Sequence, residues 1–390
     1  MLGIAGYSTV HAAGVENAAS WRAVLAGASG LKPNDLPWCE LPCWIGAVAG
    51  VDDVELPAEL RAWDCRTHRL AWMALRHEDL RAAVAGAVAR YGAARVGVVL
   101  GSSTSGIRST ELAYVRRREE DHWPQDFDYR RSHSLDALCR FSAEALGLQG
   151  PMVAVSTACS SSAKVFLTAR RWMACGLIDA ALVGGVDSLC LSTLHGFDSL
   201  QLLAGEICRP FDAERHGISI GEAAGFAVLD KQAGRINFAG GGESSDAWHM
   251  STPRPDGAGA QQAMQAALQA AALTAGDIGY VNAHGTGTLA NDRAEAIATA
   301  AVFGPGGVPV SSTKGVTGHT LGAAGITEAI ATIQALEAQT LPPSANLRTA
   351  EPGMALDLVT EPRHVALCHA MSNSFGFGGS NCSLIFSRAD

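Results

Sequence analysis

The chain has 390 residues, more than one compact core usually holds, and 48% of them are hydrophobic against 17% charged. This composition excludes a disordered chain, and the formal net charge of −9 disfavours a nucleic-acid binder. The N-terminal segment MLGIAGYSTVHAAG lacks a basic region and predicts a first strand and loop. We therefore expect a cytoplasmic protein without a membrane span.

Short apolar segments then alternate with longer segments of helical periodicity. In the first part of the chain, strands are expected over 95–103, 152–158, 180–188 and 224–230, and helices over 136–147 and 163–176. In the second part, helices are expected over 261–273 and 292–304, and strands over 278–285 and 382–387. This alternation predicts an α/β fold in which the second part repeats the style of the first.

The ten cysteines show no C-x-x-C spacing, which predicts reduced thiols and no disulfide framework. Cys39 and Cys43 form the one close pair, but they lack nearby His or Cys partners, so we expect no metal site.

Cys159 stands in VAVSTACSSSA, where an apolar strand ends and a helix is expected to begin. A sulfur at a helix N-terminus is next to unpaired N–H groups, which can lower the pKa of a thiol. The alternative is a small core residue, which is the commoner role of a free cysteine.

Two further loops carry polar groups that favour a reactive Cys159. NAHGTGTLAND contains His284, and SSTKGVTGHTLGAAG contains Lys314 and His319, with Glu328 following on a helix of small residues. A cysteine, two histidines and a Lys/Glu pair together indicate acyl transfer through a thioester.

Five motifs in order resemble the elongating β-ketoacyl-acyl carrier protein synthases of fatty acid and polyketide synthesis. They are STACSSSA, PFDAERHGISIGEAAG, NAHGTGT, KGVTGHTLGAAG and NSFGFGGSNCSLIF. The resemblance implies the thiolase fold, an α/β fold of two similar halves in α-β-α-β-α layers. It places the nucleophilic cysteine in a half formed by 1–229 and the two catalytic histidines in a half formed by 230–390.

The same resemblance implies a role for each residue. Cys159 is expected to accept an acyl group, and His284 and His319 to bind the malonyl thioester carbonyl and the enolate formed by decarboxylation. Lys314 and Glu328 are expected to orient His319 and fix the local charge.

The backbone N–H groups of Cys159 and Phe377 are expected to form the oxyanion hole, and Phe377 also matches a gating phenylalanine. No cofactor is implied, because phosphopantetheine arrives on the carrier protein. The loop FGFGGSN leads into a strand, whereas a dinucleotide fingerprint opens a helix, so a nucleotide site is disfavoured.

The expected partners are an acyl carrier protein and a second subunit, either a copy of this chain or a ketosynthase-like chain-length factor. Arg66 and Arg69 lie where the family presents a basic docking surface for the acidic carrier. The polar stretch Asp128 to His133 replaces an apolar segment near the acyl pocket and dimer contact. Either its charges face solvent, or they meet polar groups of an unlike subunit and indicate an unusual acyl chain in a specialised, polyketide-like or polyene-like pathway.

Two other classes of function fit parts of this pattern. A thiolase-type acyltransferase generally replaces one of the histidines by a second cysteine, and GHTLGAAG argues against it. A non-catalytic partner subunit would lack the nucleophile, and Cys159 argues against it.

Overall fold

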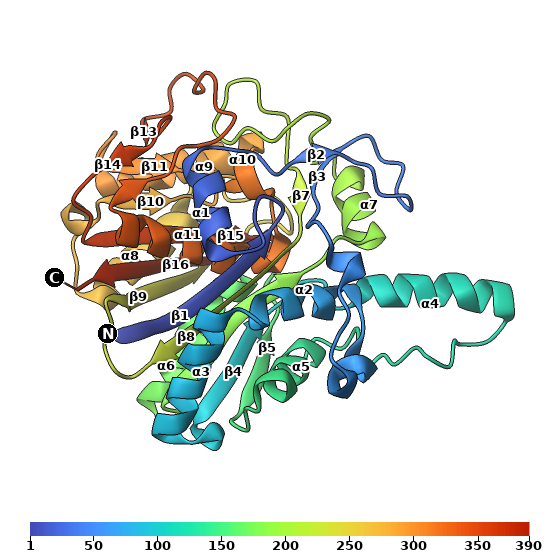
Figure 1. Cartoon of the computed structure of the whole chain (residues 1–390). Coiled ribbons are helices and arrows are strands. Elements are labelled where there is room, and N and C mark those ends of the chain that lie inside the picture. The colour runs from blue at the N-terminus through green and yellow to red at the C-terminus, as the bar shows by residue number, and fades with distance from the viewer. Residues whose placement is uncertain (390) are drawn as a thin grey trace.

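The computed structural model describes residues 1–389 and contains one sheet of eleven strands in the order β13-β11-β10-β15-β16-β9-β1-β8-β6-β4-β5 (Figure 1). The strands of the first half are β1 (Leu2–His11), β4 (Val96–Gly101), β5 (Met152–Val155), β6 (Ala180–Asp187) and β8 (Ala223–Asp230). Those of the second half are β9 (Ile236–Ser245), β10 (Tyr280–Asn282), β11 (Pro309–Ser311), β13 (Asp357–Leu358), β15 (His369–Gly376) and β16 (Ser380–Arg388). Two small sheets join β2 (Lys32–Pro33), β3 (Trp44–Gly46) and β7 (Ile220–Gly221), and β12 (Thr340–Leu341) with β14 (Arg363–His364).

The two halves of the large sheet have the same topology. From the centre outward, the first half runs β1-β8-β6-β4-β5 and the second runs β9-β16-β15-β10-β11. In each half the three inner strands pair antiparallel and the next two pairings are parallel. The predicted repeat is therefore present in the fold. We propose to divide the chain near the turn between β8 and β9, close to the expected halves of 1–229 and 230–390.

Helices cover both faces of each half of the sheet. They are α1 (Asn17–Leu25), α2 (Arg66–Leu75), α3 (Glu78–Tyr91), α4 (Ile107–Glu120), α5 (Ala137–Leu146), α6 (Ser161–Ala174), α7 (Leu191–Ser199), α8 (Ala258–Ala271), α9 (Leu289–Phe303), α10 (Lys314–Thr317) and α11 (Ala324–Ala338). No helix among the described residues is both long and apolar enough to cross a membrane.

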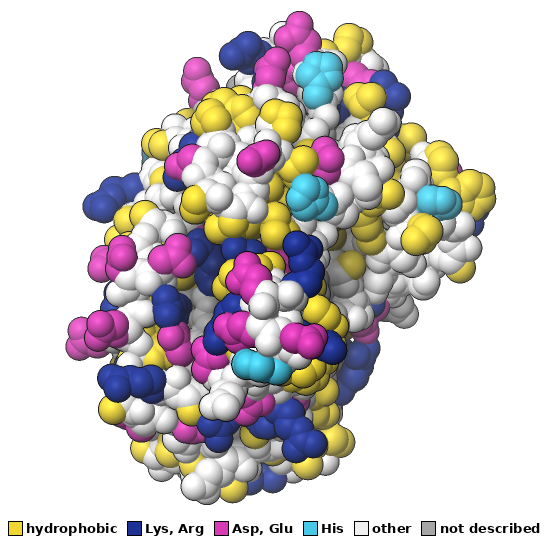
Figure 2. Space-filling view, turned by 90° about the vertical axis from the view of Figure 1, so that its right-hand side faces the viewer, with side chains coloured by type: hydrophobic (Ala, Val, Ile, Leu, Met, Phe, Trp, Pro, Cys, Tyr) yellow, Lys and Arg dark blue, Asp and Glu magenta, His cyan; other side chains and the backbone are white. Residues whose placement is uncertain are grey.

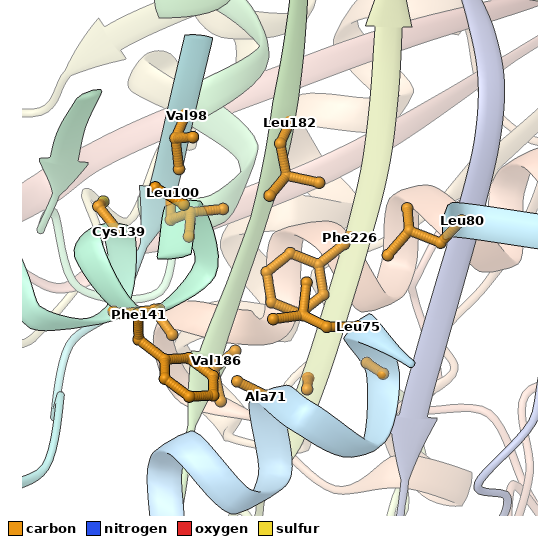
Figure 3. Close-up of a cluster of buried hydrophobic side chains, with 14 of the residues drawn as sticks. Ala71, Leu75, Leu80, Val98, Leu100, Cys139, Phe141, Leu182, Val186 and Phe226 are labelled. Carbon is orange, nitrogen blue, oxygen red and sulfur yellow. The ribbon is translucent and has the colours of Figure 1, made fainter. Parts of the chain in front are cut away.

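Three hydrophobic clusters define the layers between these elements. The outer core of the first half lies under α2, α3 and α5, where Leu75 and Phe141 pack toward Leu182 and Phe226 of the sheet (Figure 3). The central core joins α6 and α11 to strands of both halves. The outer core of the second half lies under α8. The expected α-β-α-β-α layering follows from these three cores.

Every strand and helix named from the sequence overlaps an element of its kind, with shifted ends. The largest difference is at 278–285, where the strand is limited to Tyr280–Asn282 and the following residues form a loop. Helix α4 and the loop that follows it project from the body as an arm, 107–136 (Figure 1). The charged segment Arg116 to Asp121 is exposed on this arm.

Candidate active site

Cys159 lies in the turn between β5 and α6, and the side chain is buried with 5% of its surface exposed. The preceding Ala158 adopts a left-handed φ of 52°, a strained conformation for alanine that turns the chain sharply into the helix. Hydroxyl groups hold this turn, because Ser161 accepts from the Thr157 N–H at 2.9 Å and donates to the Ala158 carbonyl. The serines of STACSSSA therefore stabilise the elbow.

The second half approaches Cys159 through the crossing of α6 and α11. A Cβ on Gly325 would lie 2.5 Å from the Ala163 nitrogen, so only glycine allows this contact without movement. The Ile326 N–H donates to the Ser162 hydroxyl at 2.9 Å across the same crossing. The contact brings the His319 loop, which immediately precedes α11, against the cysteine elbow.

His319 is next to the sulfur. Its Nε2 lies 3.0 Å from Cys159 Sγ, and its Nδ1 accepts a hydrogen bond from the Leu321 N–H at 3.2 Å. A neutral imidazole carries one hydrogen, and an accepting Nδ1 assigns that hydrogen to Nε2. His319 therefore donates toward Cys159 in this tautomer and cannot take the thiol proton.

His284 has the same arrangement with a different partner. The Lys314 ammonium lies 3.2 Å from its Nδ1 and also binds the His284 carbonyl and the Glu328 carboxylate. Because an ammonium only donates, the hydrogen of neutral His284 is on Nε2. The Lys314/Glu328 pair thus supports His284, which corrects the expectation that it orients His319.

Burial and Lys314 together keep the two imidazoles neutral. Burial lowers the pKa of His284 and of His319 well below the usual range, and the positive charge of Lys314 lowers both further. Burial also raises the pKa of Glu328 to about 7.

The Cys159 thiol differs from the sequence-based expectation. Burial raises its pKa to about 11, and this effect outweighs the lowering by Lys314 and by the backbone N–H groups of Phe377 and Cys159. The prediction of a lowered pKa counted the helix N-terminus and omitted desolvation. A pKa of about 11 favours the neutral form of this thiol at neutral pH.

The three side chains also have the composition of a metal site. The ligand atoms of Cys159, His284 and His319 lie within 4.8 Å of one another, and Cys and His are the usual zinc ligands. The Leu321 N–H donates to Nδ1 of His319 and the Lys314 ammonium to Nδ1 of His284, so the hydrogen of each neutral imidazole lies on Nε2. A metal ion that bound Nε2 would have to displace this hydrogen. The hydrogen bonds around the two histidines therefore favour donors over metal ligands.

These groups open into a cavity of about 410 Å³. Its apolar wall is formed by Phe197, Leu200, Leu202, Ile218 and Phe375, and its polar wall includes Thr286, Thr288, Asn291 and Asp246. Phe377 lies between β15 and β16, lines the cavity and contacts Phe197 with ring centroids 5.4 Å apart. In the described chain, Cys159 is the one cysteine in this lining.

Sequence reasoning missed two buried carboxylates that hold the His284 loop. Glu295 accepts from the backbone N–H groups of His284 at 2.8 Å and Gly285 at 2.7 Å. Asp292 accepts from the Gly287 N–H at 3.2 Å and pairs with the buried Arg215. The signal was an acidic pair on a helix directly after a glycine-rich loop, where backbone N–H groups need acceptors.

The remaining predicted residues lie outside the cavity and already have partners. Arg66 is bound to buried Glu222 and to Asp52, and Arg69 to Asp64. In the stretch Asp128 to His133, which does not line the cavity, Asp128 accepts from the backbone of Arg130 and Arg131. The side chains of Arg130 and Arg131 are exposed, and the Arg131 guanidinium lies 3.6 Å from the Asp128 carboxylate, so both charges face solvent in the single chain.

Comparison with known proteins agrees with this geometry. Residues 67–234 match "Beta-ketoacyl synthase, N-terminal domain" and residues 237–348 match "Beta-ketoacyl synthase, C-terminal domain". The chain belongs to the beta-ketoacyl synthase family. It is thus a condensing acyltransferase with the thiolase-like fold of that family.

Relatives of this synthase carry more than one name. It is 39% identical over 319 residues to 3-oxoacyl-[acyl-carrier-protein] synthase 2 of Vibrio cholerae, covering 76% of each chain. It is 37% identical over 308 residues to nodulation protein E of Rhizobium meliloti, again covering 76% of each. The solved ketosynthase ApeO, in complex with its chain length factor ApeC from Xenorhabdus doucetiae, is 37% identical with a TM-score of 0.90, covering 100% of this chain and 98% of that one.

Proposed function

We propose that the synthase joins an acyl group held on Cys159 to the two-carbon unit of a malonyl thioester. The observation that carries this proposal is the pair of Nε2 hydrogens of His284 and His319 in one buried site with the Cys159 sulfur. Two fixed donors at one point stabilise an oxygen that becomes negative in the transition state.

In the first half-reaction, Cys159 sulfur attacks the carbonyl carbon of an acyl thioester on the phosphopantetheine arm. The backbone N–H groups of Cys159 and Phe377, which face the sulfur, stabilise the tetrahedral oxyanion. The bond to the phosphopantetheine sulfur then breaks, and the thiol proton of Cys159 ends on that departing sulfur.

In the second half-reaction, the malonyl thioester oxygen accepts from His284 and His319. The C–C bond to the carboxylate breaks and carbon dioxide leaves. The electron pair of that bond stays on the remaining carbon and forms the enolate. The enolate carbon attacks the acyl carbonyl, and the bond to Cys159 sulfur breaks. One proton from solvent restores the thiol. Lys314 holds the His284 tautomer, and Glu328 compensates the Lys314 charge.

Separate assays of the two half-reactions test these roles. We expect Cys159→Ala to abolish acyl transfer and to keep malonyl decarboxylation. His284→Ala and His319→Ala each remove one donor to the enolate and should slow decarboxylation by about a hundredfold or more. Wild-type decarboxylation rates in both histidine variants would contradict the assignment.

We propose an acyl carrier protein as the substrate carrier and an unlike ketosynthase-type subunit as the partner. ApeO, which shares the fold over the whole chain, was solved in complex with a chain length factor. β5 is an edge of the large sheet, and the α4 arm carries exposed apolar residues beside charges of both signs (Figure 2). The exposed apolar residues of the arm and of β5 are Leu112, Tyr114, Val115, Trp123, Tyr129, Leu135 and Met152.

Copurification with ketosynthase-like neighbours, followed by assays with saturated and polyunsaturated primers, tests this partner and the specialised pathway. A stable heterodimer that prefers unsaturated or aryl-capped chains is expected. A stable homodimer that elongates saturated chains best would instead indicate ordinary fatty acid synthesis.

A further inference from the structure

Helix α7 forms part of the apolar wall of the cavity but has few contacts with the body of the protein. Of its nine residues, Leu194 is the one that is fully buried. Phe197 and Leu200 extend from its C-terminal end into the wall, and Phe197 contacts Phe377. An element with so little burial depends on the groups that fix its ends.

The N-terminal end of α7 has no capping side chain of its own. Cys190 occupies the N-cap position, and its sulfur lies 3.1 Å from the Thr193 hydroxyl but makes no cap hydrogen bond to the first backbone N–H groups of the helix. The cap comes from Glu111 of α4, which accepts from the Leu191 N–H at 3.1 Å and from the Ser192 N–H and hydroxyl, both at 2.7 Å. A carboxylate is well suited to this position because the N-terminus of a helix carries unpaired donors and partial positive charge.

Glu111 is itself held in place from the side of α4. Arg108, one turn earlier, pairs with the Glu111 carboxylate at 3.2 Å, and both side chains are about one-eighth exposed. The Arg108 guanidinium stacks 4.1 Å from the ring centre of Trp38, which packs in the same hydrophobic cluster as Phe197. The first turn of α4 thus contacts the start of α7 and the cluster beneath it.

We propose that Glu111 is a positioning residue for the acyl end of the cavity. By capping α7, it sets where Phe197 stands against Phe377, and so how readily the wall accommodates a long acyl chain. This inference rests on the proposed function and adds that the acyl group on Cys159 extends along the wall formed by Phe197 and Leu200. The donors for the malonyl thioester belong to other loops and do not depend on α7.

The test compares Glu111→Gln with the wild type in three assays: condensation with a twelve-carbon primer, condensation with acetyl primer, and malonyl decarboxylation. Glutamine keeps the size of the side chain but replaces one accepting oxygen by a donor that faces N–H groups. We expect the KM for the long primer to rise about tenfold, the scale of a lost hydrogen bond to a charged group. Acetyl-primed condensation and decarboxylation should stay within about twofold.

Glu119→Gln is the matched control, because Glu119 is exposed on the same helix and is expected to leave all three assays unchanged. In a Phe197→Ala background, Glu111→Gln should have little further effect on the long primer. Equal losses in all three assays with a lower unfolding temperature would show a merely structural role and overturn the inference, as would additive effects with Phe197→Ala. A wild-type enzyme inactive with both primers would contradict the proposed function itself.

Discussion

The properties of Cys159 are set by two opposing effects at a single atom. The elbow places the sulfur near backbone donors and Lys314, whereas burial removes the water that would stabilise a thiolate. Because the pKa is raised to about 11, the thiolate fraction at neutral pH is small and grows with pH.

Alkylation of the unliganded enzyme by iodoacetamide should therefore accelerate with pH at Cys159, by about tenfold per pH unit between 7 and 10. At pH 7 the exposed Cys175 and Cys368 should be labelled before it. Peptide mass spectrometry at several pH values measures this order. Rapid, pH-independent labelling of Cys159 would mean that donors outweigh burial at the sulfur.

The two arginines predicted to contact a carrier protein should respond differently to substitution. Arg66 neutralises Glu222, which is fully buried and also accepts from the Val48 and Leu189 N–H groups. Arg66→Ala should cost about 3–5 kcal/mol of unfolding free energy, because it leaves a buried charge without its partner.

Arg69 is more exposed and pairs only with surface groups, so Arg69→Ala should leave stability within about 1 kcal/mol. If Arg69 contributes to docking, the KM for carrier-bound substrates should rise and its salt dependence weaken, with no change for a pantetheine thioester. Urea titration and steady-state kinetics separate the two residues. A folding defect in Arg69→Ala would contradict this division.

Among the secondary-structure elements, the crossing of α6 and α11 connects the nucleophile to His319. At Gly325 even one methyl group would meet the backbone of Ala163, so Gly325→Ala should destabilise the fold by about 1–3 kcal/mol. It should also slow decarboxylation, since α11 begins just after His319.

Gly86→Ala is the control for the intrinsic effect of alanine in a helix. Gly86 lies in α3 with no atom within 4 Å of an added Cβ, so the free energy of unfolding of this variant should rise by about 0.5–1 kcal/mol. Chemical denaturation measures both variants. If Gly325→Ala and Gly86→Ala changed the free energy of unfolding equally, α6 and α11 would tolerate a wider separation at their crossing.

Element types could be predicted from the sequence because apolar periodicity is a local property. The meeting of Cys159, His284 and His319 was predicted from motif order and resemblance. The support of His284 by Lys314 was not predicted, because Lys314 is only five residues from His319 in the sequence. The turn at Gly318, with φ of 71°, separates Lys314 from His319, and Lys314 binds His284 instead. Glu222, the partner of Arg66, lies 156 residues away in the sequence, so a local sequence pattern cannot predict the pair.

For the whole molecule, the edge of the sheet at β5 is where we propose that another subunit binds. Met152 is 41% exposed on this edge, and a charge there opposes strand pairing. Met152→Glu should weaken association with the partner subunit in analytical ultracentrifugation of the copurified complex. Ile297→Glu, at an apolar position on α9 of the other half that is 50% exposed, should leave the subunit state unchanged. Identical sedimentation of Met152→Glu and the wild type would place the subunit contact elsewhere.

The repeated strand order has a consequence for how the reaction is divided along the chain. Cys159 follows β5, whereas Lys314 and His319 follow β11, the strand with the same place in the second half. His284 follows β10, and at the matching place after β4 the residues Ser103 and Thr104 bind the buried Asp187 instead. In the proposed reaction, the first repeat holds the acyl group and the second repeat supplies the donors to the enolate. Because the proposed reaction needs groups from both repeats, neither repeat expressed by itself should retain the condensation.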